Sequence, residues 1–128
     1  MFFTGMDRDA TGLGRDFDVI NGRAYMGNVP TPRTTVGDRV RLRVLALGTE
    51  FHMVHLHGHR WQTPAGPEDS SLLGPSGSLT IDFVEDEPGT WMFHCHVAEH
   101  MENGMMGDYV ALPRGQAQGD RAPAPMEM

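Results

Sequence analysis

The sequence has a single cysteine, no long apolar run and no helix-length hydrophobic period. One cysteine among 128 residues excludes an internal disulfide. No apolar run approaches the roughly 20 residues that a spanning helix needs, so we expect no membrane span. The first residues lack the basic flank and long apolar segment of a signal peptide, which indicates either a mature chain or part of a larger one. A net charge of −7 argues against nucleic acid or an anionic membrane as the partner.

What is abundant instead points to short strands. The 16 glycines and 9 prolines are spread along the chain, as in proteins whose many strands are joined by turns. We expect an all-β, Greek-key sandwich or barrel of seven to eight strands over residues 1–113, and a flexible C-terminal tail over residues 114–128. The expected strands are residues 2–7, 16–20, 23–26, 39–47, 51–57, 78–84, 90–96 and 107–112, with 60–62 as a candidate extension of the fifth.

The segments between these strands are predicted as follows. Residues 9–15, 30–32 and 63–77 are expected to be loops without strands, and residues 97–103 to hold a short helical turn. The acidic sequence Glu85-Asp86-Glu87 is interpreted as a solvated turn. The alternative is an electrostatic binding site for a cationic or phenolic electron donor.

All seven histidines fall in two short stretches, which scattered core or surface histidines would not do. The second stretch also holds the only cysteine. Cys95 lies between His94 and His96, with His100 five residues later and Met105 ten residues later. A thiolate, imidazoles and a thioether are the donor set of a blue-copper electron-transfer site.

Because successive residues of a strand face opposite sides, the two stretches predict two separate clusters if their strands are neighbours. One cluster lies on the apolar side and has the donors of type-1 copper. Its members are His52, Cys95, His100 and Met105. The other faces away and consists of imidazoles alone: His55, His57, His94 and His96.

The imidazole-only cluster suits Cu(II), or a group of coppers that meets oxygen. Four histidines are about half of what three coppers need, so another domain or subunit would have to supply the rest. Cys95 and its neighbours His94 and His96 join the two clusters covalently. An electron that reaches the first cluster would need only a few bonds to reach the second.

Two motifs resemble those of multicopper oxidases. His52-Met53-Val54-His55-Leu56-His57-Gly58-His59 is similar to the family's third copper motif, with Met53 where proline is usual. His94-Cys95-His96, followed by His100 and Gly104-Met105, is similar to the fourth motif. The lead-in from Pro88 to Phe93 and the hairpin at Ile20–Arg23 also resemble the family's final cupredoxin domain, as found in two-domain small laccases and ceruloplasmin-like oxidases.

The resemblance implies a cupredoxin-like fold and a role for each histidine. His52, Cys95, His100 and Met105 would hold type-1 copper. His55 would bind the type-2 copper, and His57, His94 and His96 the type-3 pair. His59 would be no ligand but would support one. The family's first two motifs are missing from this sequence, so a second cupredoxin domain, or further copies of this chain in a homo-oligomer, would complete the trinuclear cluster.

The resemblance further implies a laccase-type oxidase located outside the cell or in the periplasm. Such an enzyme takes single electrons from a phenolic or metal-ion donor and passes them through Cys95, His94 and His96 to reduce O2 to water. The alternative is a single-copper cupredoxin that only transfers electrons.

Overall fold

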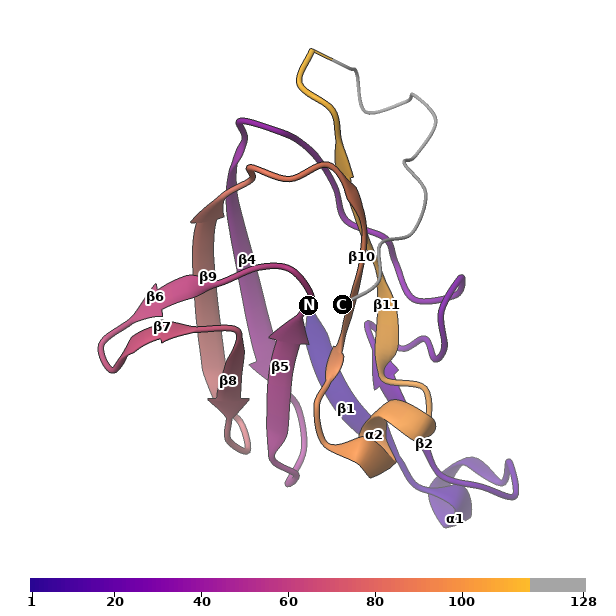
Figure 1. Cartoon of the computed structure of the whole chain (residues 1–128). Coiled ribbons are helices and arrows are strands. Elements are labelled where there is room, and N and C mark those ends of the chain that lie inside the picture. Colours follow the sequence, from indigo (N-terminus) through magenta and orange to yellow (C-terminus); the bar gives the residue numbers. More distant parts are fainter. Residues whose placement is uncertain (116–128) are drawn as a thin grey trace.

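The computed structural model describes residues 1–115, and Figure 1 shows its course. These residues form eleven strands and two short helices. In chain order they are β1 (Phe2–Met6), α1 (Arg8–Thr11), β2 (Phe17–Ile20), β3 (Arg33–Thr35), β4 (Arg39–Ala46), β5 (His52–Leu56), β6 (Trp61–Thr63), β7 (Gly66–Glu68), β8 (Ser70–Leu73), β9 (Ser78–Val84), β10 (Gly89–Cys95), α2 (Ala98–Glu102) and β11 (Met106–Leu112).

Two sheets and a small ribbon make up the fold. One sheet has the order β2-β1-β4-β9 and the other the order β3-β11-β10-β5-β8, while β6 and β7 pair only with each other and project from the side (Figure 1). The pairs β1–β4 and β11–β3 are parallel, and the remaining pairs are antiparallel. The all-β prediction is confirmed. The described residues contain no helix long and apolar enough to cross a membrane.

The alternation of side chains that the sequence predicts for residues 39–47 is present in β4. Val40 and Val44 are buried, whereas Arg39, Arg41 and Arg43 are exposed. The partner strand β9 buries Ile81 in the same core. Burial of one apolar face on each sheet is the main source of stability for such a sandwich.

The predicted return strand at residues 23–26 is wrong. Asn21 and Gly22 do form a tight turn with positive φ angles of 52° and 78°, but only one bridge follows it, between Ile20 and Arg23. The chain then leaves the sheet, because the Tyr25 N–H donates to the Gly104 carbonyl at 2.7 Å instead of to a strand. This contact ties the turn to the segment before Met105.

The predicted strand-free loop at residues 63–77 is also wrong, since it contains β7 and β8. Strand β8 pairs with β5, and the Trp61 indole donates to Ser71 Oγ at 2.8 Å, which holds the β6–β7 ribbon against it. The candidate extension at residues 60–62 belongs to this ribbon as β6 and does not extend β5. These short pairings bring the described strands to eleven, above the seven or eight expected.

Residues 30–32 form a loop as predicted, but the strand after them was not predicted, and the predicted loop at residues 9–15 begins within a short helix. Strand β3 follows Pro32. Helix α1 begins after Asp7, whose carboxylate accepts from the Asp9 N–H at 2.7 Å as an N-cap. The helical turn expected in residues 97–103 is confirmed as α2. The predicted flexible tail at 114–128 lies, beyond Gly115, outside the described residues.

Candidate metal centre

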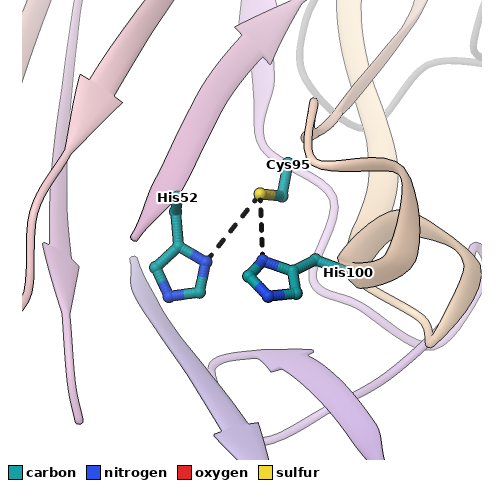
Figure 2. A group of neighbouring side chains, drawn as sticks. All are labelled: His52, Cys95 and His100. Atoms are coloured by element: carbon teal, nitrogen blue, oxygen red, sulfur yellow. Dashed lines mark hydrogen bonds between the residues drawn. The ribbon is translucent and has the colours of Figure 1, made fainter. Parts of the chain in front are cut away.

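The first cluster, which we call the thiolate site, combines side chains from β5, β10 and α2. Cys95 Sγ lies 3.8 Å from His52 Nδ1 and 3.6 Å from His100 Nδ1, and Figure 2 shows both rings turned toward the sulfur. Cys95 and His52 are fully buried, and the side chain of His100 is 12% exposed. The structure therefore brings together three of the four predicted donors from two sequence stretches.

Local pairing explains why these side chains meet. Cys95 at the end of β10 pairs with Val54 of β5, which places His52 on the same inward face. The Met53 N–H donates to Cys95 Sγ at 3.4 Å, as expected for a sulfur that carries negative charge when it binds a metal. Helix α2 then returns His100 to the same point.

Met105 is the fourth predicted donor, and the structure buries it completely. Its carbonyl accepts from the Cys95 N–H at 3.1 Å, and its own N–H donates to the His100 carbonyl at 3.0 Å. The preceding Gly104 has a φ of +114°, and a Cβ there would lie 2.6 Å from Ala24 Cβ. Only glycine fits this approach without strain.

The donor set fits a first-row metal ion. Such ions bind thiolate at roughly 2.3 Å and imidazole at roughly 2.0 Å, so donors at a trigonal angle lie about 3.8 Å apart. The two sulfur–nitrogen distances agree with that separation. Burial, followed by the nearby His100, lowers the pKa of His52 to about 4, so its imidazole is neutral and able to bind a metal.

The second cluster, which we call the imidazole cluster, lies on the opposite face of β5 and β10. His57 Nε2 and His94 Nε2 are 3.1 Å apart, and the ring centre of His55 lies 4.8 Å and 5.2 Å from those of His57 and His94. His96 is exposed, with its ring centre 5.2 Å from that of His55. The structure thus brings all four predicted members together.

Hydrogen bonds outside this cluster orient two of its rings. The Nδ1–H of His94 donates to the Cys95 carbonyl at 2.9 Å, and the Nδ1–H of His55 donates to the Asp69 carbonyl at 2.7 Å. A ring that donates from Nδ1 presents Nε2 as the acceptor, which is how bonds outside a metal site orient its ligands. Burial, followed by the neighbouring histidines, lowers the pKa values of His57 and His94.

The interpretation of residues 85–87 as a solvated turn is wrong for Glu85. This residue is 1% exposed, and its Oε2 accepts from His59 Nε2 and from the Tyr109 hydroxyl, both at 2.7 Å. A sequence signal existed, because the inward positions Leu79, Ile81 and Phe83 continue by alternation to residue 85. Tyr109 carried no comparable signal.

A group of carboxylates beside the thiolate site also escaped the sequence analysis. Asp18, Glu50 and His100 place ligand atoms within 4.8 Å of one another, and Glu50 Oε2 is 3.1 Å from His100 Nε2. They line a cavity of about 340 Å³ together with Asp16 and Glu99. Burial raises the pKa of Asp18. Residues 16–20 were predicted only as a strand, and nothing in that pattern connects Asp18 with His100.

Comparison with known proteins agrees with this arrangement. A family model described as "Multicopper oxidase" matches residues 4–115. Ceruloplasmin of Rattus norvegicus is 36% identical over 104 residues, covering 77% of this chain and 10% of that protein. A probable nitrite reductase-hydroxylamine oxidoreductase fusion protein of Kuenenia stuttgartiensis is 35% identical over 100 residues, covering 74% of this chain and 12% of its own. The chain therefore spans about a tenth of the length of these relatives.

Solved structures give the same fold. The blue copper oxidase of Nitrosomonas europaea superposes with a TM-score of 0.71 at 26% identity, covering 86% of this chain and 42% of that one. The multicopper oxidase Fet3p has a TM-score of 0.72 at 18% identity, covering 87% and 31%. Fold and donor set together define a copper protein of cupredoxin fold. The chain belongs to the multicopper oxidase family.

Proposed function

We propose that this chain is the type-1 copper domain of a laccase-type multicopper oxidase. The thiolate site would hold type-1 copper through His52, Cys95, His100 and the weakly bound Met105. His55 would bind type-2 copper, and His57, His94 and His96 the type-3 pair. The observation that supports this most strongly is the position of Cys95, whose side chain belongs to one cluster while both sequence neighbours belong to the other.

Copper held by the thiolate site would supply one-electron redox chemistry, and copper held by the imidazole cluster would supply the chemistry for reducing oxygen. The protein's contribution is a short and rigid connection between the two. From Cys95 Sγ the route runs along the backbone to His94 and His96, and the His94 Nδ1–H to Cys95 carbonyl bond provides a second path. Four electrons and four protons convert one O2 into two water molecules.

The imidazole cluster supplies about half of the ligands of a trinuclear site, so its activity would require a second surface. A second cupredoxin domain or further copies of this chain would provide it, and an isologous arrangement of identical copies would do so symmetrically. The face around the cluster fits such a contact, since Leu72 of β8 is 64% exposed and pairs with Met53, which by alternation lies on the same face as His55. Exposed apolar side chains that gather on one face are typical of protein interfaces.

The electron donor would bind at the carboxylate cavity beside His100. Its acidic lining favours a cationic donor, such as a reduced metal ion, over a neutral phenol. One relative, from Mus musculus and 34% identical over 101 residues, is named a ferroxidase, which agrees with a metal-ion donor. A location outside the cell or in the periplasm, as family membership suggests, completes the proposal.

The decisive experiment combines copper count, oligomeric mass and oxygen uptake on the copper-loaded protein. We expect more than one copper per chain, and oxygen uptake only in fractions that contain a second cupredoxin domain or several copies of the chain. His96→Ala should abolish oxygen uptake and leave the blue absorption of the thiolate site intact. One copper per chain with no oxygen uptake in any fraction would instead favour a simple electron-transfer module.

A further inference from the structure

A buried network of polar side chains lies next to the imidazole cluster, and only one of its members, His59, has had a role so far, as the support of a ligand. We call it the Glu85 network; it consists of Thr34, His59, Glu85 and Tyr109. His59, Glu85 and Tyr109 are buried. The two carboxylate oxygens of Glu85 accept from three donors: His59 and Tyr109 at Oε2, and the Glu87 N–H at Oε1, 3.1 Å away.

The network pairs an imidazole with a carboxyl group in the core. His59 Nδ1 must carry a hydrogen, because it faces the His57 carbonyl at 2.7 Å, and Nε2 faces the Glu85 carboxylate. Burial alone would lower the pKa of His59, but the bonds to Glu85 and the His57 carbonyl raise it overall. Burial would likewise raise the pKa of Glu85, yet its three hydrogen bonds lower it. The hydrogen bonds themselves link Glu85 through the His59 ring to the His57 carbonyl.

A buried ion pair is a poor means of gaining stability alone, because apolar side chains of similar size often stabilise a core equally well. The Glu85 network does hold one specific group that apolar packing could not hold. That group is the carbonyl of His57, a member of the imidazole cluster.

His57 needs such a support because it lies just beyond the end of β5 at Leu56. Its N–H donates to the Met92 carbonyl at 2.9 Å, and its carbonyl accepts from His59. The next residue, Gly58, has a φ of +73° and packs against the Trp91 ring, where a Cβ would lie 2.5 Å away. The backbone of His57 is therefore held on both sides, and its imidazole reaches His94 Nε2 at 3.1 Å.

We propose that Glu85 is a positioning residue which, through His59, fixes the backbone of His57 and so aims its imidazole at His94. Glu85 touches neither copper nor oxygen in this scheme. The inference rests on the proposed function only in treating His57 as a metal ligand; the positioning itself is a property of the metal-free protein.

Glu85→Gln tests this in the complete, metal-free chain, because it keeps the size of the side chain and removes its charge. Asp86→Asn is the matched control, since it removes the adjacent carboxylate, which no described hydrogen bond joins to His59. We expect amide exchange at His57 to become about tenfold faster in Glu85→Gln, and the NMR signals of the His57 ring to shift. The Cys95 amide should exchange as in the wild type.

Tyr109→Phe is a second variant that removes one of the Glu85 hydrogen bonds and keeps the ring. It should move the His57 signals in the same direction by a smaller amount, and it serves as the test if Glu85→Gln does not fold. Unchanged His57 exchange and ring signals in a folded variant, with only a lower melting temperature, would show a purely structural role. Failure of oxygen uptake in the wild type would overturn the proposed function but leave this test valid.

Discussion

The thiolate site and the imidazole cluster share two strands but differ in how far one chain completes them. The thiolate site is enclosed: Cys95, His52 and Met105 are fully buried, and all its donors come from β5, β10 and the segment through α2 to Met105. The imidazole cluster lies on the outer face of the same strands and includes the exposed His96.

The difference follows from the pleat of the sheet. Alternate residues of β5 and β10 project to opposite faces, so the sequence His94-Cys95-His96 supplies one donor to the inner face and two to the outer face, where His94 is buried and His96 is exposed. Inward donors can be surrounded by the rest of the sandwich. Under the proposed function, the outward donors would be completed by a second surface, so the first site depends on the fold alone and the second would depend on an assembly.

Substitution of Cys95 should have the largest effect, because this residue belongs to one site and links it to the other. Cys95→Ser removes the thiolate of one site and the connection to the other, so both the blue absorption and oxygen uptake should disappear. The absorption spectrum and an oxygen electrode measure the two losses. His96→Ala is the contrasting variant, because it should remove only oxygen uptake. If Cys95→Ser still consumed oxygen, electrons would not pass from the thiolate site to the imidazole cluster through Cys95.

Substitution of Glu85 tests the support of the imidazole cluster. Glu85→Ala leaves the buried His59 without its partner, and breaking such a pair costs about 3–5 kcal/mol of unfolding free energy. Since the folded pKa of Glu85 is lowered from 4.5, its contribution is present above pH 4.5 and is lost as pH falls through the folded value.

The measurement is urea denaturation of the metal-free wild type and variant at neutral and strongly acidic pH. The stability difference between them should therefore shrink toward acidic pH. A difference that is the same at both values would mean that the carboxylate charge does not contribute. Asp86→Asn should unfold like the wild type at each pH.

Gly104 tests the enclosure of the thiolate site. Gly104→Ala combines a left-handed backbone with a Cβ only 2.6 Å from Ala24 Cβ, so it should destabilise the fold by roughly 1–3 kcal/mol. It should also change the blue spectrum by shifting Met105. Gly27→Ala is the matched control, with a φ of +85° and open space around the new Cβ. Equal effects of the two variants would show that the contact with Ala24 is unimportant.

The smallest effect on stability is expected at the carboxylate cavity beside His100. Glu50 is half exposed, so Glu50→Gln should change the unfolding free energy by no more than about 1 kcal/mol. It should nevertheless raise KM for a cationic donor and leave KM for a neutral phenol unchanged in steady-state oxygen uptake. Asp82→Asn, which removes an exposed carboxylate from β9 that does not line this cavity, is the control and should alter neither KM.

Strands with strong alternation were predictable, whereas irregular and very short ones were not. The strand at residues 78–84 was predicted with its observed bounds, and β4 within one residue, because their apolar residues recur at every second position. Strands β7 and β8 lie in a segment rich in proline, glycine and serine, and they form only because β5 and Trp61 offer partners. Residues 23–26 had the signal for a return strand, but the contact of Tyr25 with Gly104 draws them away.

The amino-acid sequence by itself determined the two donor sets, because the spacing of His52, His55, Cys95 and its neighbours assigns each side chain to a face through the two-residue repeat of a strand. Only the tertiary structure decided what surrounds those donors. The surroundings consist of contacts between segments far apart in the chain. Glu85 bonds to His59, Asp18 and Glu50 lie beside His100, and Ala24 lies against Gly104. Such contacts depend on how the sheets and loops pack, and no local period encodes them.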